Sequence, residues 1–177
     1  MLLRALVVVA GLAGAVAASQ VPELMQQYRQ RLGGAVGELV RVIEDFDADA
    51  AGEGLTRQEA LARYAASPDS FLRRRGVSME RTLARFERIV EVRRLLLDAN
   101  ALERPVLLAT YRDREVLRET VDDFRPAVPA TAEGAVYAFL GFAAGASVMA
   151  LLLALLAGMR AAWLRWWETP PRTGSWP

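Results

Sequence analysis

The chain has 177 residues and a formal net charge of +1, from 22 arginines and 21 carboxylates. This near-neutral balance argues against a nucleic-acid-binding protein, which carries a strong basic excess or a basic stripe. Cysteine and histidine are both absent, so the sequence excludes disulfides, thiol or imidazole catalysis, and zinc sites built from these residues. We therefore predict that the protein is not an enzyme and that it uses no cofactor.

The first apolar segment, residues 2–18, contains one arginine, Arg4, and no other charge. As a helix it spans about 25 Å, which is enough to cross the hydrocarbon core if Arg4 reaches the headgroups. The same residues also fit a secretory signal peptide with an A-x-A-like cleavage site at 15–17. We favour an uncleaved membrane helix over residues 1–19, because Pro22 opens a new helix directly after it.

Residues 20–130 form the predicted water-facing domain, and their apolar side chains recur at helical spacing. One stripe runs over residues 25–50 and a second over residues 72–97, both with steps of three and four. A short helix with a capping box of Thr56 and Glu59 is predicted between them. We expect an all-α fold in which the two long helices pack as an antiparallel, coiled-coil-like hairpin.

Capping residues predict where the remaining helices begin. Ser67 is the expected N-cap of the second long helix, with Pro68 in its first turn. Pro105 opens a short apolar helix, and Asp113 caps another that ends near Phe124. Alternating apolar residues and tight-turn dipeptides, which would indicate β-hairpins, do not occur.

The second apolar segment is the longer one. Residues 134–159 carry no charge and span about 39 Å as a helix, more than the hydrocarbon core of about 30 Å. We predict a membrane helix over residues 131–163, with Thr131 as its N-cap, and a cytoplasmic tail over 164–177. Residues typical of a membrane–water interface follow the apolar stretch, and these predicted anchors are Arg160, Trp163, Arg165, Trp166 and Trp167.

Positive charge lies close to the outer end of each predicted span, at Arg4 and at Arg160. Because arginine-rich flanks stay on the cytoplasmic side, both termini are predicted to be cytoplasmic. Residues 20–133 are then periplasmic, in a protein of the bacterial inner membrane.

Small residues line one face of each predicted span at four-residue spacing, and Gly141 and Gly145 form a GxxxG pattern. Helices that approach closely in lipid need such faces. Two arrangements remain open, namely packing of the first span against the second in one chain, and self-association of two copies. The absence of charge at mid-membrane argues against a proton relay or a charged ion pathway. The predicted packing residues are Gly11, Gly14, Ala15, Gly134, Ala138, Gly141 and Gly145.

Asp45, Asp47 and Asp49 have the one-three-five spacing of a calcium-binding EF-hand loop. Two positions depart from that pattern, because Ala50 stands where the loop needs glycine and Thr56 stands where it needs glutamate. On a helix, these carboxylates would point in different directions. We therefore predict a solvated helix end and no metal site, and these three aspartates remain the only candidates for cation binding.

Several short motifs together resemble a known family of bacterial membrane proteins. They are Ser19-Gln20-Val21-Pro22-Glu23, Gln27-Tyr28, Gln30-Arg31-Leu32-Gly33-Gly34, Phe46-Asp47-Ala48-Asp49-Ala50, Arg104-Pro105 and Asp123-Phe124-Arg125-Pro126-Ala127-Val128-Pro129. The family is domain of unknown function 2937, and the resemblance covers nearly the whole chain. It implies no activity, cofactor or catalytic residue, but it does imply that the segment from Ser19 to Glu23 belongs to the mature protein.

These observations predict a membrane-anchored structural, adaptor or assembly protein, acting as an accessory subunit of a membrane complex. Its expected partners are the lipid bilayer and either another membrane protein or a second copy, and no nucleic acid. The long helical hairpin is the predicted partner surface. One alternative is a homo-oligomeric channel or transporter component, and another is a carboxylate-based cation-binding protein.

Overall fold

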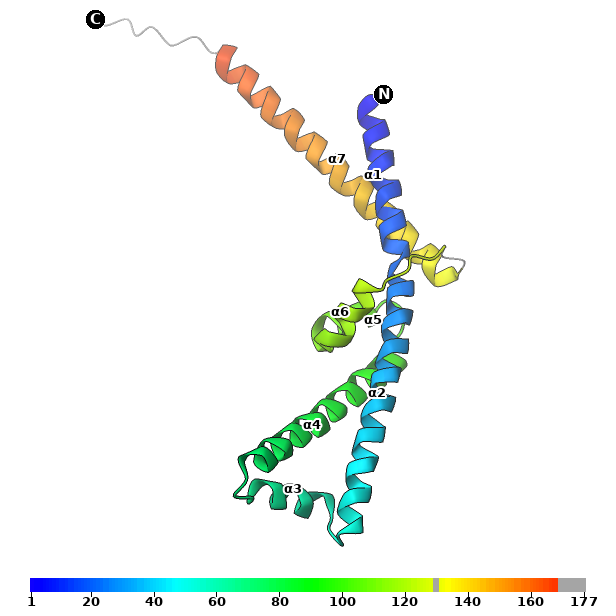
Figure 1. Ribbon diagram of the computed structural model, residues 1–177. Coiled ribbons are helices and arrows are strands. Elements are labelled where there is room, and N and C mark those ends of the chain that lie inside the picture. Colours follow the sequence, from blue (N-terminus) through cyan, green and yellow to red (C-terminus); the bar gives the residue numbers. More distant parts are fainter. Residues whose placement is uncertain (129–130, 169–177) are drawn as a thin grey trace, which may run out of the picture. The chain divides into compact units, whose positions relative to one another are not determined.

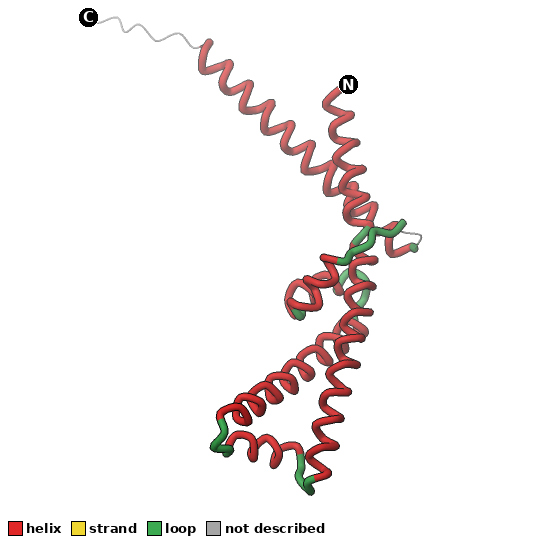
Figure 2. Tube along the Cα trace, viewed as in Figure 1, coloured by secondary structure: helices red, strands yellow, loops and turns green. Residues whose placement is uncertain are grey.

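The computed structural model describes residues 1–128 and 131–168, and the regular elements in this part of the chain are all helices (Figures 1 and 2). The predicted all-α class is therefore confirmed. Pro129 and the last residues of the predicted tail, 169–177, lie outside the described residues. In chain order the helices are α1 (Leu2–Ser19), α2 (Val21–Gly52), α3 (Arg57–Ala65), α4 (Ser70–Asp98), α5 (Arg104–Tyr111), α6 (Arg114–Asp122) and α7 (Ala132–Glu168).

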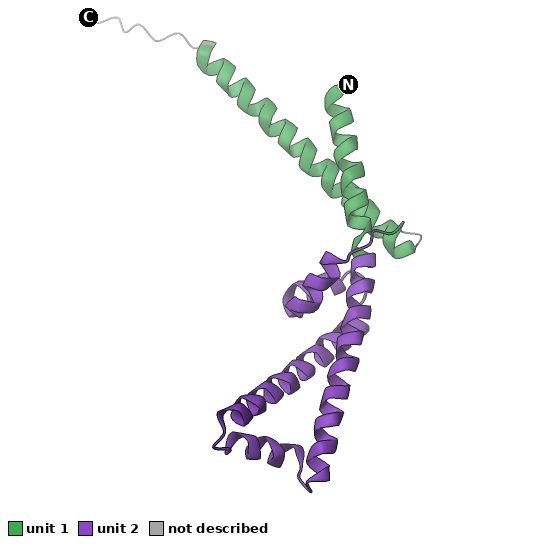
Figure 3. Ribbon diagram, viewed as in Figure 1, with its two compact units in different colours: residues 1–21, 127–177 green, residues 22–126 purple. Residues whose placement is uncertain are grey.

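The chain divides into two compact units (Figure 3). Unit 1 comprises Met1–Val21 and Ala127–Pro177, and it contains α1 and α7. Unit 2 comprises Pro22–Pro126 and contains nearly all of α2 together with α3, α4, α5 and α6.

Unit 1 contributes two helices that are long and apolar enough to cross a membrane. An 18-residue window near the N-terminus has a mean hydropathy of 2.0 and one in α7 has 2.3, and only 11% and 0% of their residues are buried. The 37 residues of α7 give a length of about 55 Å, so the helix continues beyond the predicted end at 163. The Thr131 hydroxyl accepts a hydrogen bond from the Gly134 N–H at 3.1 Å, which confirms the predicted cap.

In unit 2 the two long helices α2 and α4 run in opposite directions, and α3 joins their ends (Figure 1). They diverge toward α3, where the three helices outline a triangle. The opposite end holds the core, because six side chains from α2, α4 and α6 are less than 2% exposed there. These side chains are Tyr28, Leu32, Ile89, Leu96, Val116 and Thr120.

Tyr28 ties this core to the start of α6. Its hydroxyl accepts a hydrogen bond from the Asp113 N–H at 3.1 Å, and its ring is fully buried. Burial raises the pKa of Tyr28 above its ordinary value, because the phenolate would lose its hydration. Tyr28 therefore acts as a neutral hydrogen-bonding core residue.

The apolar stripe predicted over residues 72–97 includes Val90 and Leu97, and the second half of α4 differs from it. Val90 and Leu97 are 38% and 48% exposed, whereas Ile89, Val92 and Leu96 are buried. The first half of α4 packs against α3, and the second half packs against α5 and the core. Because the packing partner changes along α4, the buried face shifts by one residue in the second half. The apolar spacing of the first half therefore does not predict which residues of the second half are buried.

Most predicted helix ends are confirmed. α2 ends at Gly52, and Gly54 has a φ of +69°, the left-handed conformation that glycine adopts without strain after a helix. The Thr56–Glu59 capping box forms in both directions, and the carboxylate of Asp113 caps α6. Pro105 lies in the first turn of α5, as predicted.

The predicted cap of α4 is wrong. The helix begins at Ser70, and the carboxylate of Asp69 accepts a hydrogen bond from the Phe71 N–H at 2.7 Å. The hydroxyl of Ser67 instead accepts from the Asp69 N–H at 3.2 Å, in a turn that precedes the helix. A carboxylate is the stronger partner for the positive end of a helix, so Asp69 takes the capping position.

Candidate functional site

The helices of unit 1, α1 and α7, meet through their backbones. A Cβ atom added at Gly14 would lie 2.3 Å from the carbonyl oxygen of Gly141, and one added at Gly145 would lie 2.4 Å from that of Ala10. Both distances are too short for real atoms, so only glycine permits this approach. Because position 10 meets 145 and position 14 meets 141, the two helices are antiparallel.

The contact also uses residues around these glycines. A Cβ at Gly141 would lie 2.5 Å from the Cβ of Ala18, and Gly11 is covered by the ring of Phe142, whose Cε2 is 2.7 Å from an added Cβ. Phe142 was not predicted from the sequence, because the spacing of small residues gives no signal at an aromatic residue. Its place directly after Gly141, on the adjoining side of the helix, is the signal that could have indicated it.

Four of the seven predicted packing residues meet at this contact. The structure brings Gly11, Gly14, Gly141 and Gly145 together within one chain. Ala15 and Ala138 are half-buried, and Gly134 is buried in the first turn of α7.

The five predicted interface anchors lie along the last turns of α7 and are exposed. The ring of Trp167 makes edge contacts with those of Trp163 and Trp166, at centroid distances of 5.7 and 5.5 Å. These tryptophans and arginines are exposed and follow the apolar stretch of α7 directly. Such a composition is typical of a membrane–water interface.

In unit 2, the extended chain that follows α6 is held by side chains of α2. The amide of Gln27 donates to the carbonyl oxygen of Arg125 at 2.9 Å and accepts from its N–H at 3.3 Å. The guanidinium of Arg31 contacts Asp123 at 2.8 Å and Glu119 at 3.5 Å. A backbone without a neighbouring strand needs such partners, and Gln27 supplies both a donor and an acceptor.

Unit 1 contains a second contact of this kind. The amide of Gln20 donates to the carbonyl oxygen of Ala127 at 3.2 Å and accepts from its N–H at 3.1 Å. Neither glutamine contact was predicted from the sequence, because each partner lies about a hundred residues away from its glutamine along the chain. Gln20, Gln27 and Arg31 all belong to the motifs that carried the family resemblance, and so do their partners Ala127, Arg125 and Asp123.

The three candidate aspartates do not form a metal site in the structure. Asp47 pairs with Arg57 through both oxygens, with Nε to Oδ1 at 2.7 Å, whereas Asp45 and Asp49 are exposed. Helical spacing points the three carboxylates in different directions, as expected. Among the described residues, no group of three or more acidic side chains could hold a metal ion.

We expect the Asp47–Arg57 pair to make unfolding of the α2–α3 turn dependent on pH. The hydrogen bond from Arg57 lowers the pKa of Asp47, so its stabilisation is present above the unfolded-state pKa of about 3.9 and is lost as the pH falls below it. Asp47→Asn should cost about 0.5–1 kcal/mol at pH 7, because both side chains are more than a third exposed. Hydrogen exchange of residues 50–60 at pH 7 and pH 3 measures this.

The difference between wild type and Asp47→Asn should shrink at pH 3 and in high salt. Glu38→Gln, which removes a more exposed carboxylate from the same helix, is the control. A difference that stays constant between pH 7 and pH 3 would contradict an ionic role for Asp47.

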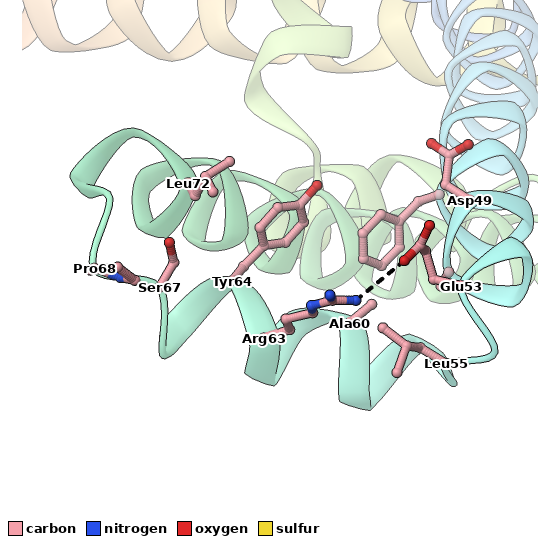
Figure 4. A pocket seen from close by; sticks show the side chains of 11 residues that line it. Asp49, Glu53, Leu55, Ala60, Arg63, Tyr64, Ser67, Pro68 and Leu72 are labelled. Atoms are coloured by element: carbon pink, nitrogen blue, oxygen red, sulfur yellow. Dashed lines mark hydrogen bonds and ion pairs between the residues drawn. The ribbon is translucent and has the colours of Figure 1, made fainter.

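A pocket of about 490 Å³ opens in unit 2 where α2 ends, α3 crosses and α4 begins (Figure 4). The rings of Phe46 and Tyr64 stack inside it, with centroids 6.2 Å apart and planes at 22°. Tyr64 is pressed against α4, since a Cβ added at Gly76 would lie 2.7 Å from the Cβ of Tyr64. Arg63 and Glu53 pair across the pocket at 3.5 Å, as the dashed line in Figure 4 shows.

A family model described as "Protein of unknown function (DUF2937)" matches residues 2–161. The chain belongs to this family. The resemblance inferred from the motifs is thereby confirmed, and all of those motifs lie inside the matched range. No curated protein and no solved structure matches this DUF2937 protein.

Proposed function

We propose that this DUF2937 protein is a membrane-anchored adaptor or assembly protein, an accessory subunit of a complex in the bacterial inner membrane. The observation that carries the proposal is the backbone contact between α1 and α7. It joins two apolar helices through one small-residue face and leaves the rest of their apolar surface exposed. Such a pair suits an anchor whose outer surface meets lipid or another membrane helix.

The proposed topology has both termini in the cytoplasm and residues 20–133 in the periplasm. Arg4, Arg160 and Arg165 supply positive charge beside the two spans, which favours the cytoplasmic side for both ends. The antiparallel contact between α1 and α7 supports this arrangement, because it puts Met1 and the anchors after residue 159 on the same side. An uncleaved α1 is part of the proposal, since α7 needs it as its partner.

The proposed partner surface is the antiparallel hairpin of α2 and α4 with the adjoining α5. Exposed apolar side chains support it, because Val106 and Phe71 are 65% and 64% exposed and Leu102 is 57% exposed. Water-facing surfaces with such side chains favour contact with another protein. An adaptor role also requires no catalytic group, in agreement with a sequence that lacks histidine and cysteine.

Crosslinking in native membranes tests this function. A photoreactive residue at position 106 should trap one recurring membrane protein, which should also co-purify with the tagged chain in mild detergent. The same residue at position 118, where the native side chain is an arginine that is 76% exposed, is the control. A monodisperse monomer that traps nothing at either position would contradict the proposal.

A further inference from the structure

We propose that the pocket between α2, α3 and α4 binds a small organic cation, an ammonium group carried on an apolar body. This inference does not depend on the proposed adaptor function, because it rests on side chains of unit 2 alone.

The cavity has the size of a small-molecule site. Its volume of about 490 Å³ lies within the range of roughly 300–1,000 Å³ typical of ligand pockets. Three consecutive helices line it, and the turn between α2 and α3 is fixed by the Thr56 capping box and the Asp47–Arg57 pair. A pocket whose walls are held in place loses little ordering entropy when it binds a ligand.

The attraction for a cation comes from two carboxylates and two rings. Asp49 and Glu53 are one helical turn apart on α2 and both line the pocket, and Figure 4 shows Glu53 directed toward Arg63. Within residues 1–128 and 131–168, Asp49 has no hydrogen-bond or ion-pair partner. Glu53 forms an ion pair with Arg63, and both side chains are 68% exposed. An ion pair this exposed contributes little stability, so a cationic ligand can compete with Arg63 for Glu53.

The rings of Phe46 and Tyr64 add the second attraction. An ammonium group within about 6 Å of an aromatic face is attracted by the electrons of the ring, by about 0.5–2 kcal/mol. Aromatic rings beside the carboxylate of Asp49 favour alkylated ammonium over an inorganic ion, because the methyl groups of the ammonium also gain from leaving water. The lining contains too few converging carboxylates for a metal, since no group of three was found among the described residues.

The remaining lining favours an apolar body and disfavours an anion. Leu55, Ala60 and Leu72 supply aliphatic surface between the helices. Arg63 is the only cationic side chain in the lining, and it already pairs with Glu53. A negatively charged ligand would therefore meet a net charge of the wrong sign.

The test uses the full chain in nanodiscs of zwitterionic lipid, with empty nanodiscs as the blank. Benzyltrimethylammonium, a soluble aromatic ammonium, is titrated by saturation-transfer NMR and calorimetry, with benzenesulfonate as the anionic counterpart. We expect the cation to bind with a Kd on the order of 1 mM or tighter and the anion not to bind. Equal binding of both, or no binding of the cation at tenfold this concentration, would overturn the proposal.

Variants assign the binding to this pocket. The double substitution Asp49→Asn and Glu53→Gln should weaken binding of the cation about tenfold, and Phe46→Leu should weaken it while keeping an apolar side chain. Glu44→Gln removes one charge from α2 outside the pocket lining and should leave binding unchanged. Circular dichroism verifies that each variant is folded, and unchanged binding in folded Asp49→Asn, Glu53→Gln protein would overturn the proposal.

Discussion

Replacing Gly14 with leucine is expected to separate α1 from α7. The Cβ of any side chain at this position would lie 2.3 Å from the carbonyl oxygen of Gly141 and 3.1 Å from its carbonyl carbon. Both neighbours are backbone atoms, so no side chain can rotate away to make room. Overpacking of this kind costs about 1–3 kcal/mol, and the upper part of the range applies where backbone must move.

Disulfide formation between Gly11→Cys and Phe142→Cys measures this separation. The chain has no cysteine of its own, so the two introduced thiols are the only ones. The ring of Phe142 fills the space next to Gly11, and its removal leaves room for both thiols. We expect rapid oxidation in membranes, and a rate at least about tenfold lower when Gly14→Leu is added, which corresponds to about 1.4 kcal/mol.

Gly158→Leu is the matched control, because a Cβ at Gly158 would meet nothing within 4 Å. It adds the same apolar side chain to α7 and should leave the oxidation rate unchanged. The mass of the product separates the two packing arrangements that the sequence left open. Disulfide-linked dimers as the main product would show that copies of the chain associate through this face, contrary to the contact within one chain.

The sequence predicted those features of the fold that are encoded within a few residues. Capping patterns act over one helical turn, so the Thr56 box and the Asp113 cap were found correctly. Ser67 and Asp69 are both good capping residues two positions apart, and choosing between them requires the geometry of the turn. The presence of a helix in this region was therefore easier to predict than the residue at which α4 begins.

Features that depend on distant residues were not predictable in this way. The contact of Gln27 with Arg125 joins residues 98 positions apart, and neither residue has a local pattern that indicates the other. The pocket exists because α3 crosses between two diverging helices, and the apolar spacing of α2 and α4 predicts only that they pack. Only the spacing of Asp45, Asp47 and Asp49 in the sequence suggested a cation site. In the structure, Asp47 instead pairs with Arg57, which the spacing does not reveal.

Replacing Leu32 with alanine is expected to destabilise unit 2 more than any exposed substitution there. Leu32 is 0% exposed in the core formed by α2, α4 and α6. Leucine-to-alanine changes at buried sites cost about 2–5 kcal/mol, because they lose burial and leave a cavity. Alanine is also the better helix former, so the cost cannot come from loss of helix propensity. We expect about 3 kcal/mol for this change.

Hydrogen exchange of the full chain in nanodiscs measures the effect in each helix separately. A loss of about 3 kcal/mol should accelerate exchange in the core part of α4 by about a hundredfold. Leu97→Ala is the matched control, because Leu97 is 48% exposed although the simple spacing places it on the buried face. It should change exchange by only a few fold. Equal effects of the two substitutions would mean that α4 turns the face predicted from its spacing toward the core, and that the shift to Ile89, Val92 and Leu96 is wrong.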